Sequence, residues 1–369
     1  MKKTMAMLLA LLLVAVMLPV TAMAEDVTQV GTYSEFKAAV DAGKSVKFTA
    51  DISGNGLVVA SGNNLVIDLG GFTYTIDGTT VGSSGTETNG MQLLQGSTIT
   101  IKNGKITSQK AQILIQNYCN LTLDGVTLDG SSLRGYGPYT LSNNNGDIVI
   151  TGNTNIIAKT GGVAFDVCRY ASYTGPQVTV TGNSVINGKV EISSSGHKEN
   201  AQHKLIVEEG TFNGDIVKYG TSPDFESNIS GGTFASNVTE YAGNNLVVTN
   251  GTNYYVGAAA NSAVANATSG TTLTVVNGTD VVLTNVPGGV TINNETNDPI
   301  MVNGKQVSND GSYTAPITII VHSEGGSTTT TPSTDTTKNP STGANDFVGV
   351  AAALAVVSVL GAAVAVRKK

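Results

Sequence analysis

Tryptophan, cysteine and histidine are nearly missing from this sequence. Among its 369 residues there are no Trp, two Cys and three His. Two cysteines cannot form a disulfide scaffold, and no histidine stands near them at metal-ligand spacing, so we expect no metal site and no cofactor. Cys119 and Cys168 are either one bridge, which an oxidising compartment permits, or two buried structural thiols.

Charge is also scarce. Charged residues make up 13% of the chain, and the formal net charge is −7. Such an acidic body repels nucleic-acid phosphates and anionic membrane surfaces, which excludes both as its partners. The chain is instead rich in Gly, with 44 copies, and in Ser, Thr and Asn. This composition favours turn-rich β structure over helix.

The N-terminus has the pattern of a secretory signal. Lys2 and Lys3 precede an apolar run over residues 5–20, and Ala22 and Ala24 form an A-x-A cleavage site. The run is shorter than the roughly 20 residues that cross a bilayer. We therefore expect residues 1–24 to be a signal peptide that is removed after Ala24; the alternative is an uncleaved membrane anchor.

The C-terminus carries a longer apolar run. Residues 347–366 contain no charge, and the chain then ends in Arg367, Lys368 and Lys369. A stretch of about 20 apolar residues is long enough for a transmembrane helix, and a basic end stays on the cytoplasmic side. Taken alone, these residues predict a C-terminal membrane anchor.

A pentapeptide upstream of this run changes the interpretation. Asn339, Pro340, Ser341, Thr342 and Gly343 precede the apolar span and basic tail in an order that resembles the cell-wall sorting signal of sortase substrates. The family pattern is Leu-Pro-x-Thr-Gly, and here an asparagine replaces the leucine. The resemblance implies that a sortase cleaves after the threonine and joins it to a peptidoglycan precursor. The protein would then lie in the cell wall of a Gram-positive-type bacterium, and residues 339–369 would be its sorting signal, whose apolar span at 347–366 lies in the membrane only before transfer.

The segment before this signal has no large apolar residue. Residues 323–338 read SEGGSTTTTPSTDTTK, a composition that cannot bury enough surface to fold. We expect a flexible Thr/Ser/Pro-rich linker that lifts the body through the wall.

The body is a degenerate repeat. Short alternating strands recur every 22 to 34 residues, most of them followed by a glycine-containing turn, and their third residues are Ile67, Ile101, Leu123, Ile150, Val180, Val207 and Ile229. A second series of strands lies between them, at residues 113–117, 139–143, 163–167, 189–193 and 215–219. Two interleaved series predict an all-β fold, a right-handed parallel β-helix over residues 25–256, with an antiparallel sandwich as the alternative. Residues 257–322 are less regular and predict a cap or a small β module.

The beginning of the repeat resembles a known fold family. Residues 30–78 look like the start of a pectin-lyase-like β-helix, with a short capping helix at 33–42 and the sequence DLGGFTYTI at 68–76. Residues 229–242 are similar to repeats of secreted and wall-anchored β-helix proteins of gut bacteria. The resemblance implies the fold more than an activity, because such proteins include lyases, hydrolases and non-catalytic adhesins.

Outward residues on stacked strands form columns, and a catalytic site requires suitable neighbours in a column. One column begins Asp68, Lys102, Asp124, and its alternating charges indicate a structural ladder. Aligning the second series gives Gln116, Ser142, Asp166, Ser193 and Lys218, with one lone carboxylate. Glycosidases use a pair of carboxyl groups. With polygalacturonase signatures and an Asp cluster for calcium also missing, we expect no catalytic residues.

Two loops on one edge of the predicted helix combine residues suited to sugars. Arg169, Tyr170 and Tyr173 lie in one, and His197 and His203 in the other. Tyrosine faces and arginine donors stack on sugar rings and bind their hydroxyls, so these residues are a candidate glycan-contact patch. The alternative is that they are solvated or structural.

Three functions remain open. The first is a non-catalytic adhesin or glycan-binding β-helix that recognises host or dietary glycans or another surface. The second is a wall-anchored polysaccharide lyase or glycoside hydrolase. The third is a structural surface component without a specific ligand. A carboxylate pair beside a base in a groove would favour the enzyme, and tyrosine-lined loops would favour binding.

Overall fold

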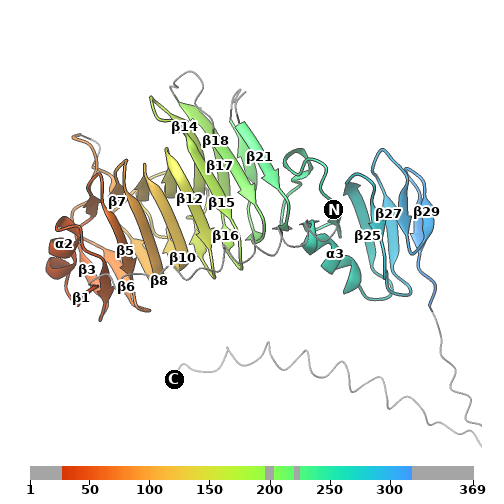
Figure 1. The fold of residues 1–369 in the computed structure, drawn as a ribbon, viewed down its shortest axis with the longest axis horizontal. Coiled ribbons are helices and arrows are strands. Elements are labelled where there is room, and N and C mark those ends of the chain that lie inside the picture. The colour runs from red at the N-terminus through yellow and green to blue at the C-terminus, as the bar shows by residue number, and fades with distance from the viewer. Residues whose placement is uncertain (1–26, 86, 196–202, 220–224, 318–369) are drawn as a thin grey trace, which may run out of the picture. The chain divides into compact units, whose positions relative to one another are not determined.

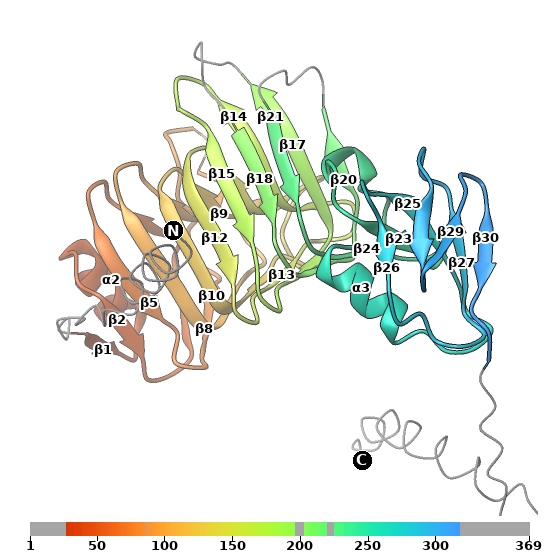
Figure 2. The same ribbon diagram turned by 45° about the vertical axis from the view of Figure 1, so that its right-hand side comes forward.

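The computed structural model describes residues 27–85, 87–195, 203–219 and 225–317. Within these ranges the chain is mostly strand, with two α-helices, which confirms the predicted all-β class (Figures 1 and 2). No helix among the described residues is long and apolar enough to cross a membrane. The predicted signal peptide, the linker at 323–338 and the sorting signal at 339–369 lie outside the described residues.

The first helix forms where the sequence predicts it. Helix α2 (Tyr33–Asp41) follows strand β1 (Thr28–Val30) and starts with a capping box, in which Thr32 and Glu35 bond to each other's backbone N–H groups. Its inner face buries Phe36, whose ring meets Phe48 edge-to-face at 4.9 Å and Tyr74 at 5.2 Å. The helix therefore closes the apolar interior at the N-terminal end.

The first strand series forms one long parallel ladder. Its strands are β2 (Val46–Phe48), β5 (Asn64–Asp68), β8 (Thr98–Ser108), β10 (Asn120–Asp129), β12 (Gly146–Thr151), β15 (Pro176–Val180), β18 (His203–Val207) and β21 (Phe225–Ile229). The seven predicted third-strand residues are direct partners from Ile67 to Ile229, so all six predicted registers are confirmed. Ile67 pairs with Ile101 despite the longest spacing, so residues 77–88 are an insertion rather than an extra turn.

A sharp turn recurs two residues after four of these partners, Ile101, Leu123, Ile150 and Val180. Asn103, Gly125, Gly152 and Gly182 all have positive φ, between 56° and 66°, a region where glycine and asparagine carry little strain. After the turn the chain adds a second short stretch to the same sheet. In β8 and β10 this stretch belongs to the same strand. Elsewhere it is a separate strand, namely β3 (Ile52–Gly54), β6 (Thr73–Ile76), β13 (Asn155–Ile157), β16 (Val185–Asn187), β19 (Thr211–Phe212) and β22 (Gly232–Phe234).

The second strand series forms a separate parallel sheet. Its seven strands are β4 (Leu57–Val59), β7 (Asn89–Leu93), β9 (Ile113–Asn117), β11 (Tyr139–Asn143), β14 (Val163–Tyr170), β17 (Lys189–Ser195) and β20 (Ile216–Lys218), in spatial order of the chain. Inward residues of both sheets, such as Ile101 and Leu141, belong to one hydrophobic core. The predicted alternation between two strand series is therefore present.

Residues after 245 surround a second core. Strands β23 (Val247–Thr249) and β24 (Tyr254–Val256) pair antiparallel, with α3 (Ala258–Ala265) after them. The remaining strands are β25 (Thr272–Asn277), β26 (Val282–Leu283), β27 (Thr291–Asn294), β28 (Ile300–Val302), β29 (Lys305–Val307) and β30 (Ser312–Thr314). Val275 and Ile292 lie in this second cluster. Three of the four strands expected here are present; at the fourth, 316–321, residues 316 and 317 are not in a strand and the rest is not described.

Candidate functional site

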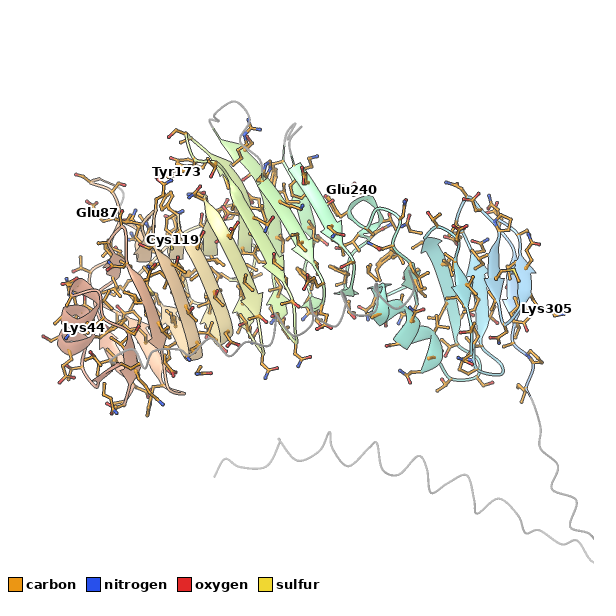
Figure 3. The ribbon with its side chains drawn as sticks, in the orientation of Figure 1. Lys44, Glu87, Cys119, Tyr173, Glu240 and Lys305 are labelled. Atoms are coloured by element: carbon orange, nitrogen blue, oxygen red, sulfur yellow. The ribbon has the colours of Figure 1, made fainter. Side chains whose placement is uncertain are left out.

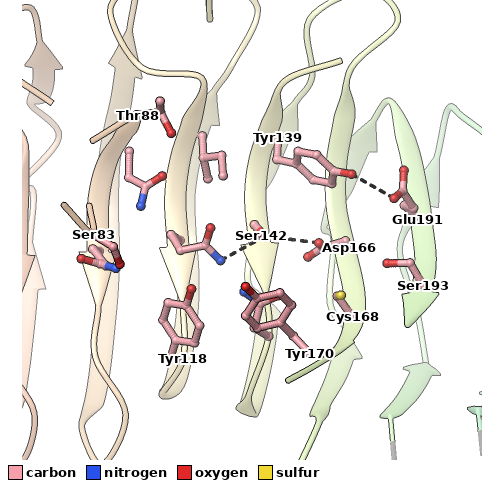
Figure 4. A pocket seen from close by; sticks show the side chains of 15 residues that line it. Ser83, Thr88, Tyr118, Tyr139, Ser142, Asp166, Cys168, Tyr170, Glu191 and Ser193 are labelled. Carbon is pink, nitrogen blue, oxygen red and sulfur yellow. Dashed lines mark hydrogen bonds between the residues drawn. The ribbon is translucent and has the colours of Figure 1, made fainter. Parts of the chain in front are cut away.

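A polar groove runs across the outer face of the second sheet. Its cavity volume is about 530 Å³, and its walls come from β7, β9, β11, β14 and β17 (Figure 4). Neighbouring strands lie about 4.8 Å apart, so five strands give the groove a length of roughly 19 Å. An opening of this length and polarity suits an extended polar ligand.

The floor of the groove is a ladder of polar side chains. One residue comes from each strand, namely Gln92, Gln116, Ser142, Asp166 and Glu191. Residues on either side of each, such as Leu141 beside Ser142, point into the core because successive side chains of a strand alternate between faces. In-register parallel pairing then stacks the polar residues into one row.

This ladder corrects the predicted column. Asp166 pairs with Glu191, whereas Ser193 pairs with Cys168 and Lys218 pairs with Ile192. An irregularity in β14 between residues 163 and 165 moves the partner of Asp166 from Ile192 to Glu191, and the predicted alignment had placed β17 one further residue out of register. The prediction of a lone carboxylate was wrong, because two carboxyl groups are neighbours in the groove.

Asp166 is held by neighbours on β11. Ser142 Oγ donates to its Oδ2 at 3.2 Å, and the backbone N–H of Asn143 donates to its Oδ1. Gln116 Nε2 in turn donates to Ser142 Oγ at 3.2 Å. Burial raises the pKa of Asp166 to about 8; these hydrogen bonds oppose the shift, and the Glu191 carboxylate adds to it. Asp166 is therefore mostly protonated at neutral pH.

Glu191 has the opposite surroundings. Tyr139 donates its phenolic O–H to Oε1 at 2.9 Å, and Lys189 Nζ lies 3.1 Å from Oε2. Burial, and then the bond to Glu191, raise the pKa of Tyr139, so the phenol keeps its proton and stays a donor. Lys189 also donates to Tyr219 Oη at 3.0 Å. The two neighbouring carboxyl groups therefore have different hydrogen-bond and charge partners.

Three tyrosines gather at one end of the groove. The Tyr118 and Tyr173 rings lie 5.1 Å apart, and Tyr170 stacks on Tyr173 at 6.5 Å with an interplanar angle of 21°. Tyr173 projects from the loop beyond the strand ends (Figure 3). Thr174 Oγ1 donates to Asn145 Oδ1 at 3.0 Å and ties this loop to the preceding coil. The cluster offers aromatic faces beside the polar ladder.

The structure keeps only part of the predicted glycan patch together. Tyr170 and Tyr173 lie side by side at the groove, and Tyr170 is 40% exposed. Arg169 and His203 are only 4% and 1% exposed, and neither is among the residues that line the groove. The His203 ring packs against Phe225 at 5.3 Å, and His197 lies outside the described residues. Tyr118 and the carboxyl pair were not predicted as site residues.

The sequence leaves open whether Cys119 and Cys168 form a disulfide or are two buried thiols. Both are held as buried thiols rather than as a bridge. Burial raises the pKa of Cys119 to about 12, which keeps it unreactive. Cys168 lines the groove beside Asp166. The Cys119 thiol also donates to Asn117 Oδ1 at 3.3 Å, so it has a structural contact inside the fold.

The predicted charged ladder lies on the first sheet. Lys102 pairs with Asp68 on one side and Asp124 on the other. Asp68 Oδ1 accepts from the backbone N–H of Gly70 at 2.9 Å and from Asn103 Nδ2 at 3.1 Å. The carboxylate therefore fixes two turns.

Comparison of the chain with protein-family models, curated proteins and solved structures finds no match. The fold and the groove define an all-β protein with a polar, tyrosine-flanked groove on a parallel sheet.

Proposed function

We propose that this chain is a sortase-anchored surface protein whose body is a right-handed parallel β-helix with a glycan-binding groove. The helical path is supported by the chain alternating between two parallel sheets and by the positive-φ turn that recurs at Asn103, Gly125, Gly152 and Gly182. The hand is supported by the general rule that parallel crossover connections are right-handed in about 98% of cases.

Attachment to the cell wall follows from the two ends of the sequence. Residues 1–24 direct export, and the sequence from Asn339 to Gly343, the apolar span at 347–366 and the basic tail supply the order that a sortase substrate needs. The partners are then a sortase and the amine of a peptidoglycan precursor, and Thr342 is the residue transferred. The linker at 323–338 holds the body away from the wall.

One observation supports glycan binding, namely the polar ladder flanked by tyrosines. Gln116, Ser142 and Asp166 offer amide, hydroxyl and carboxyl groups that pair with sugar hydroxyls, and Tyr118 and Tyr170 line the same groove. Tyrosine rings stack on the apolar faces of sugars. Because the floor carries carboxyl groups and no arginine, the groove favours neutral glycans over anionic ones. A purely structural surface protein has no need for such a groove.

A glycan array on the full-length protein tests this function. Tyr170→Ala removes one aromatic face, and we expect an affinity about tenfold lower, which corresponds to about 1.4 kcal/mol. Tyr136→Ala is the matched control, because Tyr136 is fully exposed on a loop outside the groove. Equal losses in both variants, or no neutral glycan bound by the wild type, would contradict the proposal and favour a structural component.

A further inference from the structure

The carboxyl pair, Asp166 and Glu191, indicates a chemical activity of the groove; this inference rests on the proposed function and deepens it. We propose that the groove hydrolyses the glycosidic bonds of its ligand with retention of configuration, with Glu191 as nucleophile and Asp166 as acid and base. The observation behind it is that two carboxyl groups, one on β14 and one on β17, face the same groove as direct register partners.

The spacing of the two strands that carry these residues is compatible with this reaction. Adjacent parallel strands place equivalent residues about 4.8 Å apart. Retaining glycosidases need their two carboxyl groups about 5–5.5 Å apart, whereas inverting ones need about 6.5–9.5 Å to admit a water molecule between them. Direct neighbours in a ladder suit the shorter separation. Next-but-one neighbours, such as Ser142 and Glu191, lie too far apart for it.

The surroundings separate the two roles. Asp166 is buried beside Ser142 and holds its proton at neutral pH, because its pKa is raised to about 8. The Glu191 carboxyl group lies 3.1 Å from Lys189 Nζ and accepts a hydrogen bond from Tyr139. A pair of carboxyl groups in different environments is the arrangement that an acid and a nucleophile require.

The reaction balances with water as the only co-reactant. A Glu191 carboxylate oxygen bonds to the anomeric carbon as the glycosidic C–O bond breaks, and Asp166 gives its proton to the leaving oxygen. Water then attacks the same carbon and gives a proton to Asp166, while the bond from the sugar to Glu191 breaks. One glycosidic bond and one water are consumed, and both carboxyl groups return to their starting protonation.

Two residues position the nucleophile. Tyr139 and Lys189 each hold one oxygen of Glu191. Their bonds orient the carboxylate across the groove, and the loss of either would leave it free to rotate. Tyr139→Phe is expected to lower kcat while KM changes little, with activity partly kept because Lys189 remains.

The test combines trapping with turnover. Wild-type protein is incubated with 2,4-dinitrophenyl 2-deoxy-2-fluoro-glycosides of gluco, galacto, manno and xylo configuration, and with neutral glucan, mannan, galactan and xylan. We expect one fluoro-glycoside to add a single sugar mass to the peptide that contains Glu191, and new reducing ends from the matching polysaccharide. Glu191→Gln abolishes both signals, and Glu226→Gln, on the other sheet, changes neither.

Asp166→Asn separates a catalytic role from a structural one. Its kcat/KM on polysaccharide should fall about 10²–10⁴-fold, the usual contribution of a general acid. Trapping by the dinitrophenyl sugars should survive, because that leaving group needs no proton. Polysaccharide binding without labelling or new reducing ends overturns the inference and leaves the binding function intact. If no polysaccharide binds, both fail.

Discussion

The two long sheets present columns of side chains with the same spacing and different chemistry. On the first sheet Asp68, Lys102 and Asp124 alternate in charge. On the second, Asp166 and Glu191 are like groups placed side by side. A neutralising column stabilises the fold at little cost, whereas adjacent carboxyl groups must change protonation or find other partners. Costly arrangements of this kind concentrate at functional sites, which is why we place the site on the second sheet.

The largest expected loss of stability comes from a substitution in the core directly beneath the groove. Phe165→Ala removes a fully buried ring next to Asp166 and should lower the free energy of unfolding by about 3–5 kcal/mol. Phe212→Ala, on the first sheet, should cost a similar amount, because Phe212 is also buried and stacks on Phe234 at 4.9 Å. Denaturant unfolding measures both losses.

Glycan binding by these two variants tests whether the site lies on the second sheet rather than on the first. We expect Phe165→Ala to weaken binding under conditions where both variants remain folded, since the groove floor shifts into the cavity. Phe212→Ala should bind like the wild type. Equal binding by both would mean that the second sheet does not hold the site.

The next effect concerns the pH dependence of stability. Asp166 has an unfolded-state pKa near 3.9 and a folded-state pKa of about 8, because burial penalises its charge. Between these values the unfolded chain releases a proton that the folded chain keeps, so this group's contribution lowers stability as pH rises from about 4 to about 8. Above pH 8 the loss is complete, and below pH 4 it vanishes.

Asp166→Asn should remove this slope. The amide can still accept from the backbone of Asn143 and can donate to Ser142, so the variant should be more stable than wild type at pH 9 and the difference should shrink toward pH 4. Thermal unfolding across this range measures the difference. Asp124→Asn, an exposed member of the first-sheet ladder, is the control and should show no such gain. A gain that is equal at pH 4 and pH 9 would contradict the linkage.

The sequence predicts the first sheet better than the second for a physical reason. On the first sheet apolar and polar residues alternate strictly, as in LTLDG, and a positive-φ residue ends the run at Asn103 or Gly125, so one register satisfies both signals. Strand β14 is different, because its residues from Val163 to Arg169 are all buried and alternation cannot fix their pairing. The bulge there moved Glu191 beside Asp166, and no sequence signal marks it.

The tyrosine site was predictable only in part. Tyr170 and Tyr173 could be grouped because they share one short loop. Tyr118 is 52 residues before Tyr170, and only the stacking of coils brings it to the same rim. Arg169 and His203 were assigned to a surface by their polarity, but each lies within a strand whose register turns it into a buried position.

The smallest expected effect tests whether the first-sheet column is neutralised by its lysine. Lys102→Met leaves Asp68 and Asp124 on either side of an uncharged residue, and we expect a loss of about 0.2–1 kcal/mol in unfolding free energy, the range for opposite charges at neighbouring positions of a sheet. The loss should shrink in 1 M salt, where the Debye length falls to about 3 Å. Lys47→Met, on the same sheet and also paired to Asp68, is the control because that lysine flanks only one member of the column. If Lys102→Met instead costs more than the Phe165→Ala change, charge balance rather than packing holds this sheet together, and the contrast between a structural and a functional column fails.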